Sequence, residues 1–95
     1  MRIVGRERLT EAERHYPGSG LGKALEVWLR VAEGAKWRHF MDVRATWSGV
    51  GNVPPHVVFD LKGNRFRLTS IIHYGTQTVL VLRVQSHKEY TRKGL

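Results

Sequence analysis

Apolar positions in the first half of the chain recur every three or four residues, whereas those in the second half alternate with polar positions. Helical spacing extends over residues 9–16 and 21–32, and a shorter pattern of the same kind covers residues 37–47. Residues 48–55 are rich in Gly and Pro and predict a loop between this helical half and a sheet. The apolar pair at residues 3–4 is too short to stand alone, so it is expected to join that sheet.

The second half predicts a β-meander. Residues 56–62 and 65–72 flank a Gly-Asn pair, which is a strong signal for a two-residue hairpin turn. This turn places Asp60 opposite Arg67, so an acidic and a basic side chain lie side by side on one face. The other face is then a continuous apolar surface for the helices, made of Val57, Phe59, Leu61, Phe66, Leu68 and Ile72.

A second hairpin is predicted with a three-residue loop at 75–77 and a return strand over 78–86. Its register brings four pairs of residues face to face: Ile71 with Val81, Thr69 with Arg83, Arg67 with Gln85, and Arg65 with His87. The same register sends three apolar side chains of the return strand to the core, those of Leu80, Leu82 and Val84. The polar face therefore gathers Arg65, Arg67, Arg83 and His87 at one end of the sheet.

Composition narrows the possible partners. A chain of 95 residues supports one core, so residues 1–95 are expected to form a single domain. The 16 Lys and Arg against 8 Asp and Glu leave a formal charge of +8, which favours a polyanion. Cysteine is absent, which excludes disulfides and thiolate chemistry. Because charge interrupts the N-terminal segment and no apolar run reaches transmembrane length, we expect a cytoplasmic protein without a membrane partner.

The residues gathered on the polar face suit phosphodiester transesterification. Arg67 and Arg83 would stabilise charge on the transition state, and His87 or a neighbour would take the proton of an RNA 2′-hydroxyl. Tyr90 would donate a proton to the leaving oxygen or stack on a base. Such a site requires RNA, and it requires neither a metal nor another cofactor. The remaining histidines lack metal-ligand spacing.

Three segments of the second half carry a likeness to a known family. They are the run from Val57 through Lys62-Gly63-Asn64-Arg65-Phe66-Arg67-Leu68, the later Leu82-Arg83-Val84, and the closing Ser86-His87-Lys88-Glu89-Tyr90. Together and in this order they resemble the HigB toxins of type II toxin-antitoxin systems. The N-terminal strand, the helix with Trp28 and the segment around Trp37 fit the same pattern, so the resemblance covers nearly the whole chain.

The resemblance implies a compact RelE-like α+β domain, in which two to three helices pack on one face of a small antiparallel sheet. It also implies an endoribonuclease that cleaves messenger RNA on the translating ribosome. A HigA-type antitoxin with a helix-turn-helix region would neutralise this activity, and operator DNA would be contacted only through that antitoxin. Matching positions give Arg67, Arg83, His87 and Tyr90 as catalytic candidates. The RNA-binding candidates are Lys62, Asn64, Arg65, Lys88, Arg92 and Lys93.

Other interpretations of the same residues remain open at this stage. His87 could instead be only a cap at a strand end, and Arg67 with Asp60 a structural cross-strand pair. Lys88, Arg92 and Lys93 also fit a solvated tail. Two other functions are consistent with the charge and the fold class: a non-catalytic RNA-binding module, and a ParE-like toxin that acts on gyrase.

Overall fold

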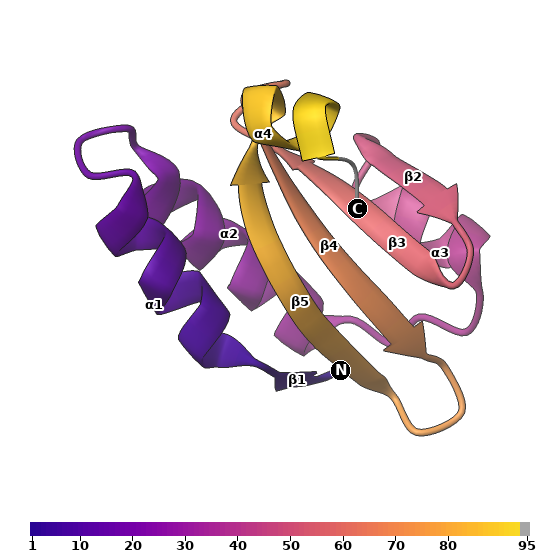
Figure 1. The fold of residues 1–95 in the computed structure, drawn as a ribbon. Coiled ribbons are helices and arrows are strands. Elements are labelled where there is room, and N and C mark those ends of the chain that lie inside the picture. Colours follow the sequence, from indigo (N-terminus) through magenta and orange to yellow (C-terminus); the bar gives the residue numbers. More distant parts are fainter. Residues whose placement is uncertain (94–95) are drawn as a thin grey trace.

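The structure, a computed structural model, describes residues 1–93. Five strands and four helices follow one another along the chain (Figure 1). In chain order they are β1 (Arg2–Val4), α1 (Arg6–His15), α2 (Leu21–Gly34), α3 (Phe40–Thr46), β2 (Val50–Val53), β3 (His56–Leu61), β4 (Phe66–His73), β5 (Thr78–Ser86) and α4 (His87–Lys93). None of the described helices is long and apolar enough to cross a membrane.

The strands form one sheet in the order β1-β5-β4-β3-β2. Strands β2 to β5 pair antiparallel, as a meander does, but β1 runs parallel to β5, so the sheet is mixed and not purely antiparallel as predicted. The N-terminal strand runs parallel because it enters the sheet at the same end as β5 and leaves it into a helix. The α+β class is confirmed.

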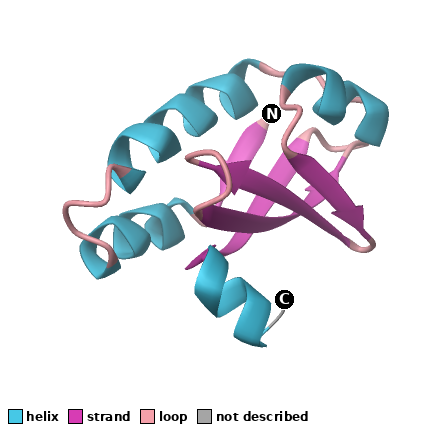
Figure 2. Ribbon diagram, turned by 90° about the horizontal axis from the view of Figure 1, so that it is seen from above, coloured by secondary structure: helices cyan, strands magenta, loops and turns pink. Residues whose placement is uncertain are grey.

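The apolar core lies between the sheet and the first three helices. α2 and α3 cover one face, α1 packs along β5, and α4 lies on the opposite side of the sheet (Figure 2). The helical stripes predicted from sequence are buried, with Leu9 and Ala12 on α1 and Leu25 and Trp28 on α2. Phe59 lies at the centre, where the rings of Trp28, Trp37 and Trp47 pack around it.

The first hairpin has the predicted register. Asp60 pairs with Arg67 and Val58 pairs with Thr69, and the pair nearest the turn is Leu61 with Phe66. The backbone of the turn is left-handed at Lys62 and Gly63, with φ of 51° and 67°. The six predicted core side chains are all buried.

The second hairpin contains a bulge that the sequence did not predict. Its loop has four residues, 74–77, so Ile71 pairs with Leu80 and not with Val81. The register then shifts between Thr69 and Ser70, which leaves Leu82 as an extra residue on β5. Beyond this bulge the predicted pairs are correct, Thr69 with Arg83 and Arg67 with Gln85.

The bulge changes which apolar residues of β5 reach the core. Val79 and Val81 are buried beneath the helices, with exposed fractions of 0% and 1%. The prediction that Leu80 and Leu82 join the core face was therefore wrong, because it assumed a regular ladder. Val84 does pack against the core, as predicted.

Two elements were absent from the prediction. β2 forms within the segment predicted as a loop, because its residues pair with β3 from Val50 opposite Phe59 to Val53 opposite His56. The Gly and Pro residues of this segment favoured a loop, so the sequence pattern did not predict this edge strand. α4 replaces the predicted tail, and it begins where β5 ends.

Candidate active site

Arg67, on the middle strand β4, is the centre of a polar cluster on the sheet face that α4 partly covers. Its side chain is only 12% exposed. Nε lies 3.1 Å from Asp60 Oδ1, the residue directly opposite on β3. Nη1 donates to the carbonyl oxygens of Asn64 and Phe66, each at 3.3 Å. Nη2 donates to Asn64 Oδ1 at 2.6 Å and contacts His87 Nδ1 at 3.1 Å.

The contact between Arg67 and His87 defines the state of the imidazole ring. A guanidinium only donates hydrogen bonds, so Nδ1 of His87 must accept this one. The lone pair of Nδ1 is therefore directed at the guanidinium and engaged by it, which assigns the tautomer with its hydrogen on Nε2. The backbone supports the placement, since His87 N donates to the carbonyl oxygen of Arg65 at 2.6 Å.

Tyr90 lies one turn along α4 from His87 and folds back over the sheet. Its ring centroid is 5.7 Å from the Arg67 guanidinium carbon, within cation–π range. Ser86 caps this helix, because its hydroxyl accepts a hydrogen bond from the backbone N–H of Glu89 at 3.1 Å. Ser86 and Glu89 match the capping-box spacing, a sequence signal that would have revealed α4.

An open cleft of about 670 Å³ borders the cluster. It lies where the α1–α2 loop, the β3–β4 turn and the start of α4 meet. Four predicted site residues line it, namely Asn64, Arg65, His87 and Lys88. Gly18 and Ser19 line the opposite wall, and the Lys62 ammonium lies against Gly20 of the same loop. Gly18 and Ser19 were not among the predicted site residues.

Arg83 belongs to different surroundings. It shares the sheet face of Arg67, but it lines a smaller cavity between α1 and β5 and forms no ion pair with any of the residues described. Arg92 is exposed on the last turn of α4, and Lys93 lies 4.0 Å from Glu89. The structure thus groups Arg67, His87 and Tyr90, and it places Arg92 and Lys93 away from them.

Two unsatisfied acceptors lie between the two arginines. Among the residues described, Thr69 Oγ1 and Gln85 Oε1 are buried without a hydrogen-bond partner. Thr69 is opposite Arg83 and Gln85 is opposite Arg67, so donors and free acceptors alternate on this face. Buried polar atoms without partners are costly, so these two oxygens lower the stability of this part of the sheet.

Two further properties concern chemistry outside this cluster. Residues 1–93 contain no group of three or more His, Asp or Glu side chains placed to hold a metal ion. Burial raises the pKa of the Tyr74 phenol above 10.0, and the negative charge of Asp42 raises it further. Tyr74 lies in the β4–β5 loop, at the far end of β4 from Arg67.

The fold and the cluster define a class of protein: a small basic α+β domain with an arginine-bound histidine beside an open cleft. The HigB_toxin family, described as the RelE-like toxic component of a toxin-antitoxin system, matches residues 22–93 of the 95. The chain therefore belongs to the HigB toxin family. Toxins of such systems act together with an antitoxin. A search for similar curated proteins returned no match.

Proposed function

We propose that this toxin is an endoribonuclease that cleaves messenger RNA, on the translating ribosome and without a metal. One observation carries the proposal: His87 Nδ1 is held 3.1 Å from a guanidinium beside a basic cleft. Family membership supports the role of a toxin. A cytoplasmic HigA-type antitoxin with a helix-turn-helix region would restrain the activity and would be the only partner to contact operator DNA.

The proposed reaction starts with binding of a phosphate at Arg67. An anionic phosphate oxygen is a stronger acceptor than a neutral imidazole or a carbonyl oxygen. It would draw Nη2 away from His87 and replace the long 3.3 Å contacts of Nη1. The lone pair of His87 Nδ1 would then be free beside the bound phosphate, positioned as a general base.

The chemical step is attack by the RNA on itself. The 2′-oxygen forms a bond to phosphorus while the bond to the 5′-oxygen breaks, and Nδ1 of His87 takes the 2′ proton. Tyr90 gives its phenolic proton to the leaving 5′-oxygen, and Arg67 stabilises the charge on the phosphoryl oxygens. The products are a 2′,3′-cyclic phosphate and a 5′-hydroxyl end. Lys62, Arg65 and Lys88 add salt-sensitive affinity for neighbouring phosphates, and Asn64 supports Arg67.

The test maps RNA ends after induction of the toxin. Wild type should create new 5′-hydroxyl ends in messenger RNA, and His87→Ala should lose about a hundredfold or more of this cleavage. His73→Ala is the matched control, because His73 is exposed at the opposite end of β4. Wild-type induction without new ends would overturn the proposal. Inhibition of gyrase supercoiling by the same protein would instead assign a ParE-like activity.

A further inference from the structure

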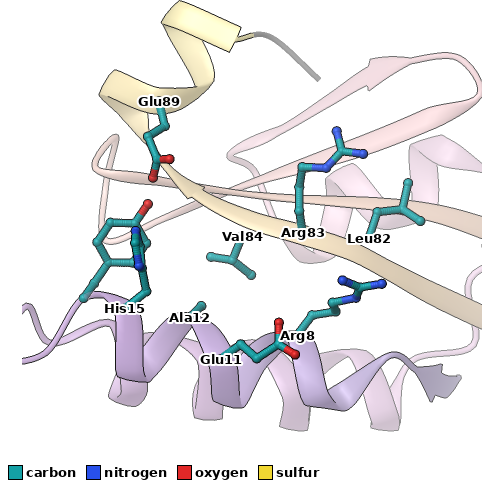
Figure 3. A pocket seen from close by; sticks show the side chains of 9 residues that line it. Arg8, Glu11, Ala12, His15, Leu82, Arg83, Val84 and Glu89 are labelled. Atoms are coloured by element: carbon teal, nitrogen blue, oxygen red, sulfur yellow. The ribbon is translucent and has the colours of Figure 1, made fainter.

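The smaller cavity that contains Arg83 has no part in the proposed chemistry. It measures about 290 Å³ and lies between α1 and β5, with one residue of α4 at its end (Figure 3). α4 separates it from the larger cleft, because Glu89 lines this cavity while His87 and Lys88 line the other. Its volume is near the lower limit for small-molecule sites, so it has room for one ring system and not for a chain.

The floor of this cavity is an unpaired stretch of strand. On the edge of β5 that faces away from β4, β1 pairs only from Thr78 to Leu80, so within residues 1–93 no strand covers the later part of that edge. Hydrogen-bonded and non-hydrogen-bonded pairs alternate in an antiparallel ladder. The backbone N–H of His87 points to β4, where it donates to the carbonyl oxygen of Arg65. Because the direction alternates along the strand, the N–H of Ser86 and both the N–H and C=O of Val84 point the other way, toward α1.

Ser86 N already has a partner, since it donates to the Tyr16 hydroxyl at 3.2 Å. Val84 therefore offers one N–H and one C=O side by side in the cavity. A peptide strand would need a longer free edge, and α1 packs against this part of β5. A heteroaromatic base, whose edge also carries a donor next to an acceptor, matches the backbone groups of a single residue.

The charges of the lining distinguish a base from a phosphate. Two arginines, Arg8 and Arg83, and two glutamates, Glu11 and Glu89, line the cavity (Figure 3). The formal charges cancel, so the cavity has no excess positive charge for an anion, yet it presents both donors and acceptors. Apolar contact comes from the floor and from the ring of Tyr16 at one end.

We infer that this cavity binds one nucleobase of the RNA whose phosphate occupies the Arg67 cluster. The inference rests on the proposed function, which supplies the RNA. Arg83 and Arg67 lie on adjacent strands of one sheet face, at diagonal positions that are about 7–8 Å apart. A nucleotide next to the scissile phosphate is therefore within reach of the cavity. The cavity would give the enzyme a base preference beside the cut.

Titration of the isotope-labelled protein with nucleoside 5′-monophosphates, followed by NMR, tests the inference. The Val84 amide should shift in a saturable manner with at least one of the four nucleotides and should not shift with ribose 5-phosphate. Arg8→Ala and Glu11→Ala should weaken that binding about tenfold. The matched controls Arg14→Ala and Glu7→Ala, on exposed positions of the same helix, should not weaken it.

An unresponsive Val84 amide, or an equal shift with ribose 5-phosphate, would overturn the inference. So would equal weakening by the cavity variants and their controls. Because the titration needs no cleavage, the two proposals fail separately. A toxin that binds nucleotides at Val84 but creates no RNA ends overturns the proposed function, whereas cleavage without a Val84 response overturns only the base cavity.

Discussion

The phenol oxygen of Tyr16, just after α1, accepts a hydrogen bond from the backbone N–H of Ser86, 70 residues further along the chain. Ser86 is the point where β5 ends and α4 begins, and His87 follows directly. The ring of Tyr16 also packs edge-on against Phe66, next to Arg67. One aromatic side chain therefore joins the helical layer to the start of α4.

Tyr16→Phe tests this link while it keeps the ring. The change leaves Ser86 N without its acceptor, so we expect the free energy of unfolding to fall by about 1 kcal/mol. Urea denaturation measures it. RNA cleavage should fall as well, because His87 is then held less firmly. Unchanged stability together with unchanged cleavage would show that Tyr16 is only a packing residue.

Gly5 controls where α1 starts. Its φ is +92°, and a Cβ there would lie 2.6 Å from the carbonyl oxygen of Val81. Gly5→Ala combines backbone strain with this clash, so we expect a loss of about 2 kcal/mol or more in the free energy of unfolding. Gly34→Ala is the control, because nothing lies within 4 Å of its added Cβ and the residue is helical; it should gain about 0.5 kcal/mol. Equal thermal shifts for both variants would refute the clash.

Arg67 holds its cluster through the planar fork of its guanidinium. Lysine keeps the charge but cannot bond Asp60, Asn64 and His87 together, so Arg67→Lys should lower stability by about 2 kcal/mol and abolish cleavage. Arg92→Lys, on an exposed turn of α4, should change neither. Chemical denaturation and RNA end mapping of both variants give the answer. A fully active Arg67→Lys protein would mean that charge alone suffices.

The raised pKa of Tyr74 predicts that the folded protein loses stability in alkali. Burial and Asp42 raise its pKa in the folded protein, so the fold holds the phenolic proton more tightly than the unfolded chain does. This stabilisation is complete below the unfolded value of 10.0 and is lost as the pH rises through the folded value. Melting temperatures measured on both sides of pH 10.0 should therefore fall less for Tyr74→Phe than for wild type. Parallel curves would contradict the shift.

The pairings at the site were predictable because strict alternation and a Gly-Asn turn determine which residues face each other. Asp60 with Arg67 is such a pair. The pair of Arg67 with Gln85 was predicted correctly only because two differences cancel. The loop is one residue longer than expected, and the extra residue Leu82 at the bulge restores the predicted register beyond it. Sequence patterns do not reveal a bulge, because it depends on how β5 bends against its neighbours.

The placement of Arg83 and the contribution of Tyr16 depend on tertiary structure alone. Arg83 directly follows the bulge at Leu82 on β5, so it lines the cavity beside α1 and also shares the sheet face of Arg67. Tyr16 looked like one more member of an apolar helical stripe. Its hydroxyl acquires a role only when the end of β5 is brought beside it.

In the proposed reaction the 2′-hydroxyl of the RNA is the nucleophile, with His87 Nδ1 as the base that Arg67 releases. The most direct measurement uses translating ribosomes programmed with a messenger RNA that carries a single 2′-O-methyl group at the mapped cut. We expect a 5′-hydroxyl product from the unmodified RNA and no cut at the methylated nucleotide. Cleavage at the methylated nucleotide would contradict it, because the attacking oxygen would then come from water.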